Sequence, residues 1–279
     1  MKKLGIVIVV LILGVFLGGC SEQDYGENVI VVGLECNYAP FNWTQLDDSS
    51  GAVEISNAAG YCGGYDVEIA KHIATDLGKD LVIQKITDFD TLPLRVNNGD
   101  IDLIIAGMSP TSQRLEVIAF SDAYYYSDLV LIVRADSPFA KATTLDNFSG
   151  ATVAAQLGTL HNDLISQIPD VDHATPLPDF PTLTVATKTG SIDAMVAERP
   201  VAMAIVAANS DLAFVGFEEG SGFNLIGDDQ TSLIVSIGMR KDEEELLAGV
   251  NESLASLSKE TRNELMATAI INQPASEEE

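Results

Sequence analysis

One pattern of ten residues occurs twice in this chain, once in each half. Residues 98–107 read NGDIDLIIAG, and residues 189–198 read TGSIDAMVAE. In both copies a glycine ends a predicted helix, an Ile-Asp pair follows, and an apolar run predicts a buried strand. Strands that alternate with helices form parallel sheets, and ligands bind beyond the carboxyl ends of such strands. The repeat therefore predicts an α/β protein in which two sheets deliver residues to one crevice.

The rest of the chain alternates between strands and helices in the same way. In the first half we expect strands over 29–35, 81–86 and 101–106 and helices over 64–78 and 90–98. In the second half we expect strands over 129–134, 151–156 and 192–197 and helices over 159–168, 182–189 and 200–209. The pattern closes with a strand over 232–240 and helices over 243–257 and 259–271. With 279 residues, 47% of them hydrophobic, the chain can fill two cores.

The first 28 residues lie outside this pattern. Residues 1–19 combine a positively charged start, an apolar run and small residues, which predicts an export signal. The run is shorter than the roughly 20 residues of a membrane-spanning helix. Cys20 follows Leu-Gly-Gly and resembles the acylated cysteine of a bacterial lipoprotein, with residues 20–28 as lipidated N-terminus and tether. We therefore expect an exported protein, lipid-anchored on the extracytoplasmic face of the cell membrane; ordinary secretion is the alternative.

Charge and cysteine content exclude several classes of function. The chain has 15 basic and 41 acidic residues, a net charge of -26, which argues against binding to nucleic acid or to anionic lipid. It has three histidines and no Cys-x-x-Cys or His-x-x-x-His motif, so we expect neither a metal site nor a cofactor. Cys36 and Cys62 are an even pair in an exported chain, which favours a disulfide over two free thiols.

Opposite charges follow the two copies of the repeat. Arg114 lies just behind the hydroxyl-rich loop that follows the first copy, and the second copy ends in Glu198. A guanidinium holds a carboxylate through two parallel hydrogen bonds, better than lysine can. A cation from one lobe and an anion from the other predict a receptor for a zwitterion.

The motifs along the chain resemble those of the extracytoplasmic solute-binding proteins of polar and basic amino-acid ABC importers, solute-binding protein family 3. The matching stretches are 38–41 (YAPF), 64–70 (GYDVEIA), 99–102 (GDID), 106–111 with Arg114, 120–122 with Tyr125, Gln156 with 158–159, and 192–194 with Glu198. The segment 42–63 is longer than is common in the family and is similar to a Gram-positive arginine-importer subgroup.

The resemblance implies a fold and its division into domains. We expect the type II periplasmic-binding-protein fold, with two α/β lobes, each a mixed, mostly parallel sheet flanked by helices. Two hinge strands, near 126–130 and 229–233, would join the lobes. Lobe 1 would comprise 29–127 and 233–275, and lobe 2 would comprise 128–232.

The resemblance also implies roles at the backbone end of an amino-acid ligand. Arg114 would bind the α-carboxylate, and Thr159 would add a bond to it from lobe 2. Glu198 would bind the α-ammonium, where relatives usually have aspartate. Gly107 and Ser109 would offer main-chain or hydroxyl contacts.

The ligand side chain would meet a second group of residues. Tyr38 and Phe89 would sandwich it, while Phe41 and Trp43 could belong to a lid or to the core. Glu35 aligns with an acidic position that contacts the distal group in relatives that bind basic amino acids. Together with the negative charge of the chain, this favours arginine or lysine. Glutamine or another polar amino acid is the alternative.

The implied function is capture without chemistry. The expected partners are an amino acid and the permease subunits of an ABC transporter, and we expect a monomer. A cyclohexadienyl-type dehydratase on the same fold is a further alternative, but it would need a general acid and base over the reacting carbon. An amino-acid sensor would need a membrane span that leads to a signalling output.

Overall fold

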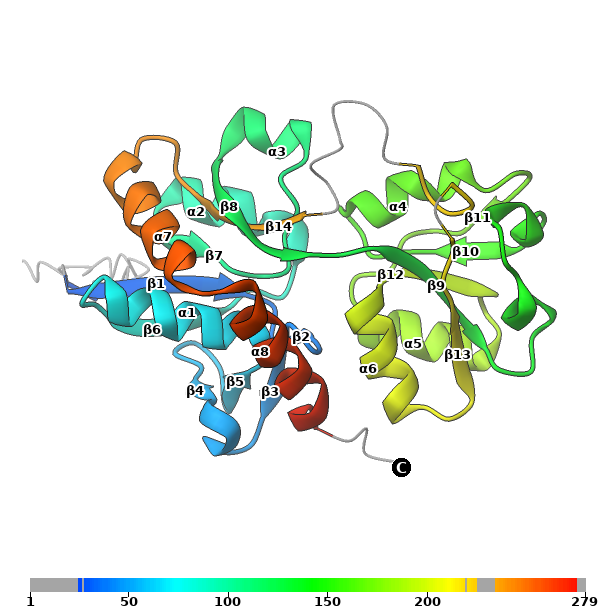
Figure 1. Ribbon diagram of the computed structural model, residues 1–279, viewed down its shortest axis with the longest axis horizontal. Helices are drawn as coiled ribbons and strands as arrows, with labels where there is room; N and C mark the ends of the chain where they lie inside the picture. The colour runs from blue at the N-terminus through cyan, green and yellow to red at the C-terminus, as the bar shows by residue number, and fades with distance from the viewer. Residues whose placement is uncertain (1–24, 27, 219, 225–233, 275–279) are drawn as a thin grey trace, which may run out of the picture.

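The computed structural model describes residues 25–26, 28–218, 220–224 and 234–274, which form two α/β lobes side by side (Figure 1). The predicted signal at 1–19, Cys20 and the predicted hinge strand at 229–233 lie outside the described residues. Among the described helices, none is both long enough and apolar enough to cross a bilayer.

The first lobe is built on a five-stranded sheet of order β6-β1-β7-β14-β8. Its strands are β1 (Val29–Leu34), β6 (Asp80–Lys85), β7 (Leu103–Ile104), β8 (Ala119–Tyr126) and β14 (Ile234–Met239). Strand β1 is parallel to β6 and β7, whereas β14 is antiparallel to β7 and β8. The sheet is therefore mixed and mostly parallel, as the sequence predicts.

Helices cover this sheet. They are α1 (Tyr65–Asp76), α2 (Leu92–Asn98), α3 (Ser112–Val117), α7 (Glu244–Ser256) and α8 (Lys259–Asn272), with a short 3-10 turn η2 (Phe89–Thr91). Helix α1 packs against α7 and α8, and α2 packs on β7 and β14. The apolar face of α1 is buried at Val67, Ala70 and Ile73. Burial of that face is what holds the helix on the sheet.

The second lobe has a five-stranded sheet of order β11-β10-β12-β9-β13. Its strands are β9 (Leu129–Arg134), β10 (Thr152–Ala154), β11 (Asp172–His173), β12 (Ala194–Glu198) and β13 (Leu212–Val215). Its helices are α4 (Leu160–Leu164), α5 (Phe180–Thr189) and α6 (Arg199–Ala208), with 3-10 turns η3 (Pro138–Lys141), η4 (Leu145–Phe148) and η5 (Ile165–Gln167). Strand β10 is parallel to β11 and β12, and β9 is antiparallel to β12 and β13. Strand β8 continues into β9, the long ribbon that joins the two lobes in Figure 1.

The sequence repeat is also a structural repeat. Asp102 donates its main-chain N–H to the carbonyl of Val31 at 2.8 Å, and its carboxylate accepts the N–H of Val31 at 2.9 Å. Asp193 makes the same pair of bonds with Thr152, at 2.8 and 2.9 Å. In each lobe the aspartate thus extends the pairing of two parallel strands by one residue. Each copy of the repeat sets the register of a strand that ends at the crevice.

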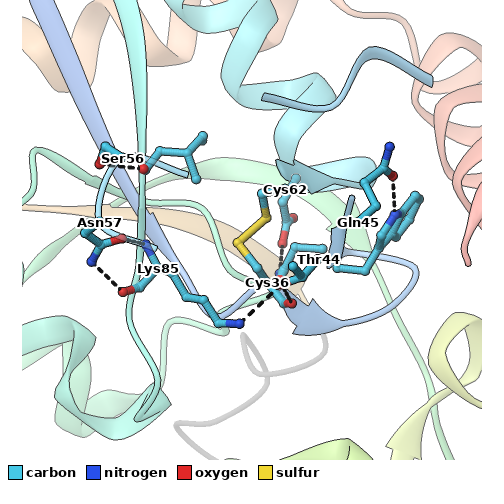
Figure 2. The surroundings of a disulfide bond; sticks show 11 residues. Cys36, Thr44, Gln45, Ser56, Asn57, Cys62 and Lys85 are labelled. Carbon is cyan, nitrogen blue, oxygen red and sulfur yellow. Dashed lines mark hydrogen bonds between the residues drawn. A yellow bond between two sulfur atoms is a disulfide. The ribbon is translucent and has the colours of Figure 1, made fainter. Parts of the chain in front are cut away.

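A small sheet of order β2-β3-β5-β4 belongs to the first lobe and lies next to its five-stranded sheet. Its strands are β2 (Asn37–Tyr38), β3 (Asn42–Gln45), β4 (Val53–Glu54) and β5 (Tyr61–Gly63), with a 3-10 turn η1 (Ser49–Gly51) between β3 and β4. A disulfide joins Cys36 to Cys62, with the Cα atoms 5.6 Å apart. Figure 2 shows Thr44 beside it, donating its hydroxyl to the Cys36 carbonyl at 2.8 Å. The disulfide fixes the segment between Glu35 and Tyr38 to this sheet.

Removing the disulfide should destabilise the protein without unfolding it at room temperature. For a crosslink between residues 26 apart in sequence, the chain-entropy estimate is about 3.5 kcal/mol. We expect a Cys36→Ser/Cys62→Ser variant to lose about that much free energy of unfolding in urea titrations. Reductant should lower the stability of the native protein to the same level and leave the variant unchanged. A loss below about 1 kcal/mol would show that the bridge contributes little.

Candidate ligand-binding site

The predicted ligand residues meet in a cavity between the lobes. All of them except Glu35 line it, together with three residues for which the motifs predict no ligand role. The lining residues are Tyr38, Phe89, Gly107, Ser109, Arg114, Gln156, Thr159, Leu160, His161 and Glu198. The lining comes from both lobes, as expected if each sheet delivers residues to a shared crevice.

Arg114 lies in the first turn of α3 and spans the crevice. Its guanidinium donates to the carbonyl of Ser109 at 2.9 Å and to the carbonyl of Gly158 in the second lobe at 3.1 Å. It also lies 5.0 Å from the centre of the Phe89 ring, within range of a cation–π contact. Burial lowers the pKa of Arg114 to about 10, which leaves the group charged at neutral pH. Arg114 therefore presents a charged fork of donors to the crevice.

Gly107 sits where no other residue fits. Its φ is +62°, and a Cβ atom there would come within 2.7 Å of the Tyr38 ring. Its N–H donates to the Tyr124 hydroxyl at 3.1 Å, and this hydroxyl donates to Asp66 at 2.7 Å. Burial raises the pKa of Asp66 to about 7, against hydrogen bonds that lower it. The Gly107 N–H is therefore already used inside lobe 1.

Glu198 ends β12 and is almost fully buried, with 4% of its surface exposed. Its carboxylate accepts the Tyr38 hydroxyl from lobe 1, and its Oε1 lies 3.3 Å from His161 Nε2. Burial raises the pKa of Glu198, but the charge of His161 and hydrogen bonds from His161 and Tyr38 outweigh it and lower the pKa. The neighbouring Arg199 bonds Asp128 instead. Glu198 is thus an ionised carboxylate at neutral pH, as a partner for an ammonium must be.

Glu35 follows β1 and does not line the cavity. It is 1% exposed, and its Oε1 accepts Gln156 Nε2 from the second lobe at 2.7 Å. Burial raises the pKa of Glu35 to about 8, the hydrogen bond from Gln156 lowers it, and Asp179, Asp66 and Asp88 raise it further. Among the residues that the structure describes, no cation therefore contributes to the pKa of Glu35.

The loop before α4 supplies the second-lobe face. Gly158 has φ +73°, and a Cβ atom there would come within 2.5 Å of Asp90 Cβ in lobe 1. Thr159 is the N-cap residue of α4, but its hydroxyl donates to the carbonyl of Gln156 at 2.7 Å rather than capping the helix. The close approach of the two lobes at Gly158 leaves no space for a side chain.

The aromatic residues divide between cavity and core. Tyr38 stacks on Phe41 with ring centres 5.3 Å apart and contacts Phe180 of the second lobe at 4.7 Å. Phe41 and Trp43 are buried, which places both in the core rather than in a lid. Tyr38 and Phe89 both reach the cavity.

The cavity is closed by direct contacts between the lobes. It has a free volume of about 20 Å³, enough for one water molecule. The contacts that close it are Tyr38 to Glu198, Gln156 to Glu35 and Arg114 to Gly158. Beyond the cavity, Gln273 behind α8 donates to the Ala204 carbonyl of α6 at 3.0 Å. An amino acid can enter only if the lobes part and some of these bonds break.

Three lining residues were not assigned a ligand role from the sequence: Gln156, Leu160 and His161. Gln156 pairs with Glu35, and His161 pairs with Glu198. Both contacts join residues that are distant in sequence, so the spacing of motifs along the chain does not predict them. The one hint in the sequence was Glu198 itself. A buried carboxylate needs hydrogen-bond donors near it, and His161 is such a donor. Among the described residues, no group of three or more His, Cys, Asp or Glu side chains could hold a metal ion.

Comparison with known proteins shows the family to which the chain belongs. The model of the bacterial extracellular solute-binding proteins, family 3, matches residues 30–269. The arginine-binding extracellular protein ArtP of Bacillus subtilis is 27% identical over 218 residues, 76% of this chain and 79% of its own. The ABC transporter glutamine-binding protein GlnH of the same species is 25% identical over 222 residues, 78% of this chain and 76% of its own.

Solved structures give the same result. The amino acid ABC transporter substrate-binding protein AbpA of Streptococcus pneumoniae Canada MDR_19A, bound to L-arginine, is 28% identical with a TM-score of 0.73. The match covers 90% of this chain and 97% of that one. Fold and site together define a two-lobed receptor for a small solute. The chain belongs to family 3 of the bacterial extracellular solute-binding proteins, which confirms the resemblance seen in its motifs.

Proposed function

We propose that this protein captures an extracellular amino acid with a cationic side chain and delivers it to the permease of an ABC importer. The observation that carries the proposal is the pairing of charges across one cavity. Arg114 of lobe 1 offers a fork of donors, and Glu198 of lobe 2 offers an ionised carboxylate. A zwitterion satisfies both groups at once.

The backbone end of the ligand would take over bonds that the protein now makes with itself. The α-carboxylate would replace the carbonyls of Ser109 and Gly158 as acceptor for Arg114, with Thr159 as a further donor. The α-ammonium would replace the Tyr38 hydroxyl on Glu198. Each of the present bonds has one charged partner, whereas the ligand would make both partners charged, so this exchange favours the ligand.

The side chain would lie between Tyr38 and Phe89 and point toward Glu35. A guanidinium or ammonium near Glu35 would favour ionisation of this buried acid, whose pKa the charges of Asp179, Asp66 and Asp88 now raise. A neutral amide, as in glutamine, is the alternative, because a protonated Glu35 can hydrogen-bond an amide without any cation. The excess of acidic residues favours the cation.

Capture would proceed by closure of the lobes around the ligand. Lobe 1 comprises 29–127 and 233–275 in this proposal, and lobe 2 comprises 128–232. The connection at Ser127 and Asp128, between β8 and β9, would act as one hinge. Ligand can favour closure only through contacts that exist in the closed form, and Glu198 with Thr159 would supply them. No chemical step is proposed.

The location of the protein follows from its predicted N-terminus. Residues 1–19 would direct export, and Cys20 would carry the lipid that keeps the protein at the membrane surface. We propose a monomer that presents its closed form to the permease subunits.

Isothermal calorimetry tests the proposal. Residues 21–279, refolded after denaturation to remove carried ligand, would be titrated with the twenty amino acids, ornithine, citrulline and cystine. We expect binding at micromolar affinity or tighter for arginine, lysine or ornithine. Binding of glutamine alone would keep the roles of Arg114 and Glu198 but overturn the cationic class. No binding to any compound would overturn the proposed function.

A further inference from the structure

His161 is a titratable group in the cavity with no role in the capture scheme described so far. It lies in the first turn of α4, and its side chain is 10% exposed. Nε2 lies 3.3 Å from Glu198 Oε1, and the ring makes an edge contact with Phe180, with ring centres 6.4 Å apart. The imidazole is therefore fixed against the carboxylate.

The other ring nitrogen shows that packing does not explain this side chain. Among the described residues, Nδ1 of His161 is buried without a hydrogen-bond partner. A buried polar atom without a partner costs free energy that a leucine of similar size would avoid. What histidine provides at this position is therefore the Nε2 contact with Glu198.

We propose that His161 is a positioning residue for the ammonium end of the ligand, holding the Glu198 carboxylate ionised and aimed into the cavity. The inference rests on the proposed function. It adds to that function a residue that acts through Glu198 rather than on the ligand directly.

The distribution of partners between the lobes carries the argument. Glu198 has one close partner in each lobe, the Tyr38 hydroxyl in lobe 1 and His161 in lobe 2. When the lobes part, Tyr38 leaves with lobe 1, whereas His161 and Glu198 stay together. His161 therefore still holds the carboxylate when a ligand arrives, and the ligand ammonium takes the place of Tyr38 on closure.

In the second lobe Arg199 follows Glu198 in the chain, and its guanidinium bonds Asp128. The other titratable groups that interact with Glu198 belong to lobe 1. Burial raises the pKa of Asp66 in α1 and of Tyr125 in β8, and the charge of Glu198 adds to both shifts. Both move away with Tyr38 on opening. Within the second lobe, His161 supplies charge and a hydrogen bond that oppose the effect of burial on the pKa of Glu198. A neutral imidazole still donates Nε2–H, so no second positive charge need lie beside the bound ammonium.

Calorimetry with two ligands separates this role from a general effect on the site. L-arginine carries the α-ammonium, and 5-guanidinopentanoic acid lacks it but keeps the carboxylate and guanidinium. We expect His161→Leu to weaken L-arginine by about tenfold or more, the loss of one charge-assisted bond, and to leave 5-guanidinopentanoic acid within about threefold. His161→Gln, which can place an amide donor near the Nε2 position, should restore most of the affinity for L-arginine.

The pH profile provides a second readout. Without His161 the pKa of Glu198 should rise, so the loss of L-arginine binding in acid should begin at higher pH in His161→Leu than in the native protein. Should the leucine variant fail to fold, His161→Gln and His161→Asn give the same test, because the shorter asparagine cannot reach Glu198 and should bind L-arginine more weakly.

A matched control exists in the first lobe. His72 Nε2 lies 3.2 Å from Asp76, a similar histidine–carboxylate pair outside the cavity. His72→Leu should leave both affinities unchanged. Equal losses for the two ligands in His161→Leu, or no loss for L-arginine, would overturn the role of His161 alone. Failure of the native protein to bind any amino acid would instead overturn the proposed function.

Discussion

Replacing Arg114 with alanine should weaken amino-acid binding by about 2 to 5 kcal/mol, roughly 30-fold to several thousandfold. The loss is large because the α-carboxylate would remain buried in the closed cavity without a cation. Arg114→Lys should recover only part of it, since an ammonium keeps the charge but not the two parallel donors. Calorimetry with the preferred amino acid measures both variants.

The control for this prediction is an arginine outside the site. Arg95 is half-exposed and pairs with Asp100 at 3.0 Å. Arg95→Ala should leave ligand affinity unchanged, because screened surface pairs contribute little. A loss of less than tenfold in Arg114→Ala would contradict the carboxylate clamp.

The sequence predicted the two sheets well because the information is local. Each copy of the Gly-x-Ile-Asp pattern combines a helix-ending glycine with an aspartate that bonds the neighbouring strand, at Gly99 with Asp102 and at Gly190 with Asp193. Both glycines have positive φ, so the turn needs this residue type. The strand predicted over 101–106 is shorter in the structure, because only Leu103–Ile104 forms a regular ladder.

Other elements could not be found from local patterns. The strands of the small sheet are two to four residues long and depend on pairing across the Cys36–Cys62 bridge. Strand β8 (Ala119–Tyr126) was not predicted because its buried residues do not alternate, and its register against β14 is irregular. These segments take their structure from contacts distant in sequence, which periodicity does not encode.

In the candidate site, too, some residues could be predicted from local sequence and others depend on contacts distant in sequence. Arg114 and Glu198 could be found because each follows a predicted strand and carries a charge. His161 could not, because its partner Glu198 comes from another strand and the contact depends on where α4 begins. Glu35 was expected beside the distal group, but the structure pairs it with Gln156 and leaves it outside the cavity lining.

The buried state of Glu35 gives the closed form a pH dependence. Burial raises its pKa from 4.5 to about 8, so the closed form binds this proton more tightly than an unfolded chain does. Protonated Glu35 therefore stabilises the closed form relative to the unfolded chain. This contribution is complete below about pH 4.5 and is lost as pH rises through about 8. A ligand cation beside Glu35 would lower the pKa of this residue again, because a positive charge favours the ionised carboxylate.

Glu35→Gln should therefore change both the selectivity and the pH dependence of binding. In the native protein, affinity for L-arginine should rise by up to about tenfold per pH unit as pH approaches 8, with proton release on binding. In Glu35→Gln that rise should disappear, and at pH 8 the affinity for L-arginine should fall by on the order of 2 to 5 kcal/mol, because the guanidinium loses its carboxylate partner.

Calorimetry in buffers of different ionisation enthalpy measures affinity and released protons together. Citrulline, a neutral analogue of arginine, should bind Glu35→Gln at least as well as the native protein. Glu54→Gln removes the same charge from an exposed position and should change neither quantity. L-arginine affinity within about threefold in Glu35→Gln, with the pH dependence retained, would show that the ligand guanidinium does not contact Glu35. Selectivity would then have to come from Asp88, Asp179 or the rings of Tyr38 and Phe89. Loss of binding for L-arginine and citrulline alike would instead show that Glu35 acts by holding the lobes together through Gln156.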